Sequence, residues 1–131
     1  MLTLFVHDDA KADLEALRAR QPLAAGRILA LLEQLECDPD LLDRLTQHGY
    51  GAYGLADFHV SKWQEQWRNG KDLWRLKVWD LEKKGIQYRI VYAFIPGKEQ
   101  YHILAITPRR NFNYDDREPI SQRILRAYED L

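Results

Sequence analysis

Three runs of aromatic and β-branched residues follow one another closely in the second half of the chain. They cover residues 73–79 (LWRLKVW), 86–95 (IQYRIVYAFI) and 100–106 (QYHILAI). Residues of these types favour β-strands. The segments between the runs, DLEKKG and PGKE, have the length of hairpin connections, which join neighbouring antiparallel strands. The sequence therefore predicts a three-stranded antiparallel meander.

The first part of the chain predicts a strand followed by a helical hairpin. Residues 2–6 (LTLFV) are rich in strand formers, and Asp8 or Asp9 can cap the helix that follows. Pro22 stands where a second helix begins, because the first helical position tolerates proline. Apolar residues then repeat at helical spacing until the CDPD segment at residues 37–40 ends the run.

The chain ends in a predicted amphipathic helix at residues 118–131 (EPISQRILRAYEDL). Its inward-facing residues are expected to be Ile120, Ile124, Leu125 and Tyr128. Because no linker or internal repeat divides the chain, residues 1–131 are expected to form one domain. The expected fold class is α+β: an N-terminal strand and a helical hairpin, an antiparallel sheet with the meander, and a C-terminal helix, with the helices packed on one face of the sheet.

Residues around 39–70 fit this plan less well and are interpreted as a Trp-bearing insertion. Ser61 and Gln64 have the spacing of a capping box, and Trp63 and Trp67 lie four residues apart. This pattern predicts a short helix that carries two indoles on one face. The indoles are either a packing stripe or a docking site for a partner helix or for RNA.

Composition restricts the class of protein. The single Cys37 cannot form an internal disulfide, and no Cys/His cluster has the spacing of a zinc site. No apolar run approaches the roughly 20 residues that span a bilayer, and the N-terminus lacks the features of a secretion signal. We therefore expect a cytoplasmic protein that uses neither a metal nor a cofactor.

The net charge of −1 hides an uneven distribution of charge. Residues 1–60 contain 5 Lys and Arg against 10 Asp and Glu, whereas residues 61–131 contain 14 against 10. The two parts therefore carry −5 and +4. Such an asymmetry indicates an anionic partner for the basic part of the chain.

Basic side chains are expected to gather on one face of the meander. Because side chains alternate along a strand, Arg75 and Lys77 share a face, and Arg89 joins them if the helices cover the other face. Arg109 and Arg110 follow the last strand, and no carboxylate is obvious among these residues. Such a cluster is costly unless an anion or an acidic partner relieves it. The simplest alternative is a half-exposed sheet face that carries long polar side chains.

A cluster of this kind suits a phosphodiester. Guanidinium and ammonium groups bind a scissile phosphate and neutralise the charge that develops on it. In RNA the neighbouring 2′-hydroxyl is an internal nucleophile, so the reaction requires only proton transfer by a lysine, tyrosine or histidine. His48 and His59 flank a glycine-rich segment, but the sequence does not show whether they approach the site. Lys83 and Lys84, in a predicted hairpin, are either solvated or within reach of phosphates.

Most of the chain, except roughly residues 39–70, resembles the RelE/ParE superfamily of bacterial toxins, and residues 73–114 carry the matching pattern. The likeness rests on a basic first meander strand, a middle strand of the YRIVY type, and a last strand that ends in a basic residue before an aromatic one. It implies a metal-free endoribonuclease that cleaves mRNA on the ribosome and is neutralised by a cognate antitoxin protein. The catalytic residues that it implies are Arg75, Lys77, Arg89, Arg109 and Tyr114. Arg110 and Phe112 are expected to bind RNA, the phenyl ring by stacking on a base.

Two other functions remain open from the sequence. ParE-type members of the superfamily inhibit DNA gyrase and do not need this catalytic set. Alternatively, the chain is a non-catalytic interaction module whose basic sheet face binds an acidic protein.

Overall fold

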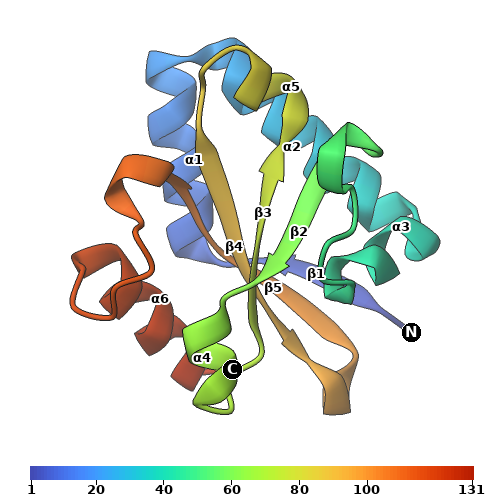
Figure 1. The fold of residues 1–131 in the computed structure, drawn as a ribbon, viewed down its shortest axis with the longest axis vertical. Coiled ribbons are helices and arrows are strands. Elements are labelled where there is room, and N and C mark those ends of the chain that lie inside the picture. Colours follow the sequence, from blue (N-terminus) through green and yellow to red (C-terminus); the bar gives the residue numbers. More distant parts are fainter.

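The computed structural model describes residues 1–131 and has an α+β fold built on a five-stranded mixed sheet (Figure 1). The strands are β1 (Thr3–Val6), β2 (Phe58–Lys62), β3 (Leu73–Val78), β4 (Tyr88–Ile95) and β5 (Gln100–Pro108). Their order in the sheet is β1-β5-β4-β3-β2. β1 runs parallel to β5, and every other neighbouring pair is antiparallel. The predicted meander of β3, β4 and β5 is therefore confirmed.

Six α-helices accompany the sheet. They are α1 (Asp8–Arg20), α2 (Pro22–Cys37), α3 (Pro39–Asp43), α4 (Gln64–Arg68), α5 (Trp79–Lys83) and α6 (Pro119–Glu129). α1 and α2 form the predicted hairpin, and Pro22 occupies the first position of α2. The predicted cap of α1 is wrong by one residue: His7 Nδ1 accepts a hydrogen bond from the Asp9 N–H, while Asp8 and Asp9 lie in the first turn. None of these helices combines the length and the apolar composition that crossing a membrane requires.

Two hydrophobic cores lie on opposite faces of the sheet. The larger one joins α1 and α2 to the sheet through residues such as Ile28, Leu35, Leu76 and Ile90. The smaller one lies beneath α6 and contains Trp63, Leu73, Val91, Ala93, Leu104, Ala105, Phe112, Ile124 and Ala127. The expectation that all helices pack on one face is therefore wrong. α6 covers part of the second face because its apolar stripe finds apolar strand residues there.

The segment at residues 39–70 contributes the outer strand β2 to the sheet. The predicted capping box is wrong, because Ser61 belongs to β2 and pairs with Arg75 of β3. α4 begins at Gln64 without a side-chain cap. The sequence does not reveal β2, because the strand is too short to show its own periodicity and α4 follows it almost at once.

Trp63 and Trp67 do not share a face. Trp63 is buried in the smaller core, where its ring centroid lies 4.9 Å from that of Phe112. Trp67 packs against the larger core, with its ring centroid 5.3 Å from that of Trp74. The two indoles therefore anchor α4 to both cores, and the prediction of a single stripe is wrong.

A bidentate ion pair fixes α6 to α1. Arg123 Nη1 and Nη2 donate to Asp13 Oδ1 and Oδ2 at 3.0 and 2.6 Å. The Ile106 N–H of β5 donates to the same carboxylate at 2.9 Å. The hydrogen bonds that Arg123 donates to Asp13 raise the pKa of Arg123. One carboxylate thus joins the C-terminal helix, the first helix and the central sheet.

We expect Asp13→Ala to lower the free energy of unfolding by about 1–3 kcal/mol, because it leaves a buried N–H and a guanidinium without their acceptor. Urea denaturation measures this difference. Glu15→Ala is the control, since Glu15 lies on the same helix but is exposed and pairs with Arg18 at 3.5 Å. Glu15→Ala is expected to lower the free energy of unfolding by less than about 0.5 kcal/mol. Equal losses for the two variants would contradict the anchoring role of Asp13.

Candidate functional site

α6 covers only part of its sheet face (Figure 1). Under the helix, β3 and β4 present apolar residues such as Leu73, Val91 and Ala93. Further along the same face, the same two strands present Arg75, Lys77 and Arg89, and β2 presents His59 and Ser61. Each strand therefore changes from apolar to polar where the covering helix ends, and the polar residues form one continuous patch.

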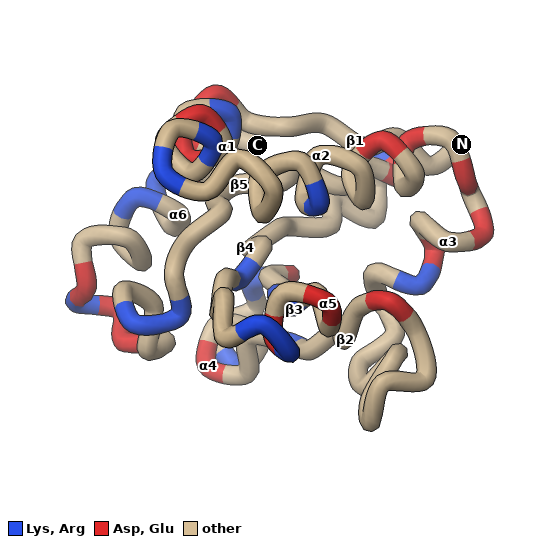
Figure 2. Tube along the Cα trace, turned by 90° about the horizontal axis from the view of Figure 1, so that it is seen from above, with Lys and Arg blue, Asp and Glu red and all other residues tan.

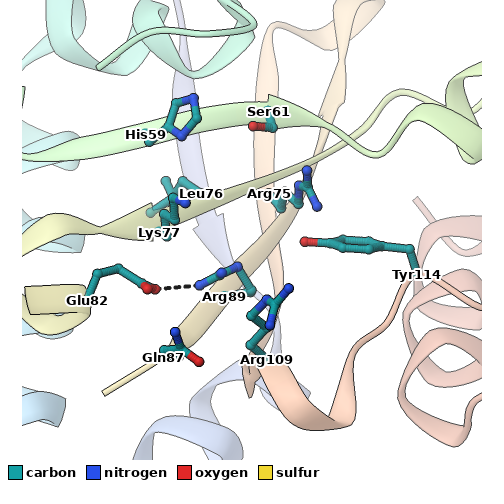
Figure 3. A pocket seen from close by; sticks show the side chains of 10 residues that line it. All are labelled: His59, Ser61, Arg75, Leu76, Lys77, Glu82, Gln87, Arg89, Arg109 and Tyr114. Atoms are coloured by element: carbon teal, nitrogen blue, oxygen red, sulfur yellow. Dashed lines mark hydrogen bonds and ion pairs between the residues drawn. The ribbon is translucent and has the colours of Figure 1, made fainter. Parts of the chain in front are cut away.

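This patch is hollowed into a depression of about 500 Å³ (Figure 3). A volume of this size is typical of small-ligand sites. Eight of its ten lining residues are polar, and the ten are His59, Ser61, Arg75, Leu76, Lys77, Glu82, Gln87, Arg89, Arg109 and Tyr114. All five residues that the resemblance implied as catalytic therefore lie together in one depression, which is called the central depression below.

Tyr114 forms one wall of the central depression and lies against Arg75. The guanidinium carbon of Arg75 is 4.0 Å from the centroid of the tyrosine ring, which is a cation–π contact. Tyr114 has a φ of 63°, which is uncommon outside glycine. Contacts of its ring with Phe112 and Trp63, at centroid distances of 4.5 and 6.3 Å, hold it there. Its hydroxyl points into the depression between Arg75 and Arg109 (Figure 3).

Arg89 differs from the other cations because it is buried and paired. It is 6% exposed, and its Nη1 donates to Glu82 Oε1 at 2.5 Å and to the Tyr88 carbonyl at 2.9 Å. The expectation that no carboxylate stands among the cations is therefore wrong. Glu82 lies on α5, in a segment that the sequence predicted as a hairpin connection.

The remaining cations of the central depression have no acidic partner. Arg75, Lys77 and Arg109 take part in none of the salt bridges of the chain. Figure 2 shows aspartate and glutamate around α3 and on α1, and also beside α6. Three unpaired positive charges therefore face the same open volume, which favours an anionic ligand.

His59 is a lining residue that the sequence did not place in the site. It pairs with Lys77 across β2 and β3, and its ring stacks on Trp79 at a centroid distance of 5.7 Å. The Trp79 Nε1–H donates to the Gly51 carbonyl at 2.8 Å, so the glycine-rich loop holds the indole in place. Recognition of β2 as a strand would have provided the missing signal, because His59 then alternates with the buried Phe58 and Val60.

Burial and mutual repulsion change the protonation of His59 and Lys77. Burial lowers the pKa of His59, and the charges of Lys77 and Arg75 lower it further. Burial also lowers the pKa of Lys77, with a second contribution from Arg89, while Glu82 partly opposes the change. Both groups therefore release a proton more readily than they would in water.

The predicted RNA-binding residues do not all reach the central depression. Phe112 is 0% exposed beneath Trp63, so the prediction that its ring stacks on a base is wrong. Lys83 and Lys84 are exposed at the end of α5 and do not line the depression. The structure therefore does not support the prediction that they contact a phosphate held there. Arg110 lines a neighbouring hollow. No group of three or more His, Cys, Asp or Glu side chains is placed to hold a metal ion.

No protein-family model, curated protein or solved structure matches this chain.

We expect Lys77→Met to raise the pKa of His59, because removal of a neighbouring positive charge makes the protonated imidazole less unfavourable. Proton NMR titration of the imidazole signals measures the change, with His59→Gln used for assignment. Lys83→Met removes a lysine outside the depression and is expected to leave the pKa of His59 unchanged. An identical His59 titration in both variants would show that His59 and Lys77 are not coupled.

Proposed function

We propose that the protein is the toxin of a toxin–antitoxin system and acts as a metal-free endoribonuclease on mRNA. The observation that carries this proposal is the convergence of three unpaired cations, a histidine and a tyrosine hydroxyl on one open depression. These residues are Arg75, Lys77, Arg109, His59 and Tyr114. The set provides both groups that bind a phosphodiester and groups that transfer protons.

The cations account for phosphate binding in the proposed reaction. Arg75 and Arg109 flank the hydroxyl of Tyr114, so a phosphate seated there receives charged donors from two sides (Figure 3). Guanidinium groups suit this role because they donate two parallel hydrogen bonds and stay charged. Arg89 contributes less net charge, because Glu82 neutralises it, and acts mainly to fix the floor of the depression.

His59 and Lys77 account for proton transfer. Because its pKa is lowered, His59 is neutral at neutral pH and accepts the proton of the ribose 2′-hydroxyl. The 2′-oxygen then bonds to phosphorus, and the bond from phosphorus to the 5′-oxygen of the next nucleotide breaks. Lys77 gives its proton to that leaving oxygen, as its lowered pKa favours. The products are a 2′,3′-cyclic phosphate and a 5′-hydroxyl, and the 2′-hydroxyl is the only nucleophile.

We further propose that the ribosome presents the mRNA, as the resemblance implies, because the net charge of −1 gives the chain little attraction to free RNA. Non-specific attraction to RNA depends on counterion release by many cations, which this chain as a whole does not offer. Presentation of mRNA by the ribosome raises its local concentration at the depression. In this proposal the protein acts in the cytoplasm, and the cognate antitoxin silences it by blocking access to the depression.

We expect Arg109→Ala to abolish growth arrest and mRNA cleavage after induced expression in bacteria, because loss of one charged donor to the phosphate costs at least about 100-fold in rate. Primer extension on cellular mRNA measures the cuts. Arg109 is exposed, so its removal should leave the fold intact. Arg18→Ala, which removes an exposed arginine of α1, is the control and should keep full activity. If expression of the wild-type protein leaves transcripts intact but stops DNA supercoiling by gyrase, the result would favour gyrase inhibition. If it leaves both transcripts and growth unaffected, the result would favour an interaction module.

The proposed roles of His59 and Lys77 predict a bell-shaped dependence of kcat/KM on pH. Activity rises with pH as His59 loses its proton, and the midpoint lies below the ordinary histidine pKa of 6.5. Activity falls again when Lys77 loses its proton, at a pH below the ordinary 10.5. His59→Asn should remove the rising limb, and Lys77→Met the falling limb. A profile with both limbs in both variants would exclude these residues as the proton-transfer groups.

A further inference from the structure

Two smaller hollows adjoin the central depression and share lining residues with it. The first, of about 330 Å³, shares Arg75 and Tyr114 and adds Lys62 and Arg68 from β2 and α4. The second, of about 190 Å³, shares Gln87 and adds Arg20 and Arg110. We call them the α4 hollow and the α1 hollow. The α4 hollow shares two lining residues with the central depression, and the α1 hollow shares one and lies at the end of the sheet, where Ile86 and Tyr88 pack against the larger core. We call the three adjoining hollows the track.

The track carries a surplus of positive charge, although the chain as a whole has no net positive charge. Its lining contains eight Lys and Arg side chains and two Glu side chains, a surplus of six positive charges, whereas the net charge of the whole chain is −1. The added cations Lys62, Arg68, Arg20 and Arg110 take part in none of the salt bridges. The positive surplus thus extends beyond the central depression on both sides.

Local contacts position two of these outer cations. Arg20 Nη2 donates to the Tyr88 hydroxyl at 2.7 Å, which directs the guanidinium into the α1 hollow that both residues line. Lys62 Nζ lies 4.4 Å from the centroid of the Trp67 ring. Neither contact neutralises the cation, so both charges remain available to a ligand.

We propose that the track binds a single-stranded RNA segment, with the scissile phosphate in the central depression and the phosphates of neighbouring nucleotides in the α4 and α1 hollows. This inference rests on the proposed function and extends its substrate from one phosphodiester to a strand of several nucleotides. Proteins that bind single strands combine a positively charged groove with aromatic side chains, and the ring of Tyr114 stands where two parts of the track meet. The outer hollows are small, which suits the phosphates of a flexible single strand better than a stiff duplex.

Fluorescence anisotropy with labelled oligouridine tests the track. The oligomers are about three and about nine nucleotides long, within and beyond the reach of the central depression, and carry 2′-O-methyl groups that prevent cleavage. The wild-type protein should bind the longer oligomer at least about tenfold more tightly, since each added phosphate contact releases further counterions.

Two double variants remove the outer cations and leave the central depression unchanged. Lys62→Ala with Arg68→Ala, and Arg20→Ala with Arg110→Ala, should each weaken binding of the longer oligomer about fivefold or more and reduce its salt dependence. Both should bind the shorter oligomer within about twofold of the wild type. Arg18→Ala with Arg126→Ala removes two exposed arginines outside the track and serves as the charge-matched control.

The outcomes separate the track from the proposed function. The proposal that RNA binds along the track is contradicted if both outer variants bind the longer oligomer as tightly as the control. It is also contradicted if the wild type binds the two oligomers equally well. mRNA cleavage that is lost only in Arg109→Ala would then still support the nuclease. If the outer variants lose affinity while no protein cleaves mRNA, the track holds as an RNA-binding surface and the nuclease proposal fails.

Discussion

The length of α6 determines where this protein can have a site. The helix has 11 residues and is therefore about 16 Å long. β5 has 9 residues and extends over about 30 Å. Ile124 and the Arg123–Asp13 pair fix the helix over one half of the sheet face. The other half stays open to solvent, and its strand residues have to be polar.

Antiparallel pairing then brings distant polar residues to the same open half. The polar positions come early in β2 and β4 and late in β3, and strands of alternating direction place these positions at one end of the sheet. His59 pairs with Lys77, and Arg89 pairs with Thr107 near the end of β5, two residues before Arg109. Residues that lie 50 positions apart in the chain therefore share one depression.

The parts of this arrangement that depend on local pattern could be predicted from the sequence. Alternation along a strand placed Arg75, Lys77 and Arg89 on one side, and short connections predicted the order of the meander. The burial of Phe112 could not be predicted, because it depends on Trp63, which lies far away in the sequence. Similarly, the place of His59 in the site depends on the pairing of β2 with β3, and that pairing is not visible in so short a strand.

Glu82 shows why a single carboxylate does not cancel the basic site. A buried guanidinium requires a partner, and Glu82 supplies it to Arg89 with little exposure of either side chain. This pair makes the floor of the depression rigid but leaves Arg75, Lys77 and Arg109 without acidic partners. Arg89 thus stabilises the fold, whereas the other three cations are available to a ligand.

The repulsion among these cations links binding to catalysis in the proposed reaction. In the free protein it contributes to the low pKa of His59, so the imidazole is ready to accept a proton. A bound phosphate brings negative charge between the cations and raises the pKa of His59. It opposes only the part of the lowered Lys77 pKa that neighbouring cations cause, and the larger part, which burial causes, remains. The charge that accumulates on the phosphate in the transition state strengthens the effect on His59, so His59 becomes a better base as the 2′-hydroxyl gives up its proton. The open cationic face therefore both holds the substrate and adjusts the proton-transfer groups, and neither effect would exist if α6 covered the whole sheet.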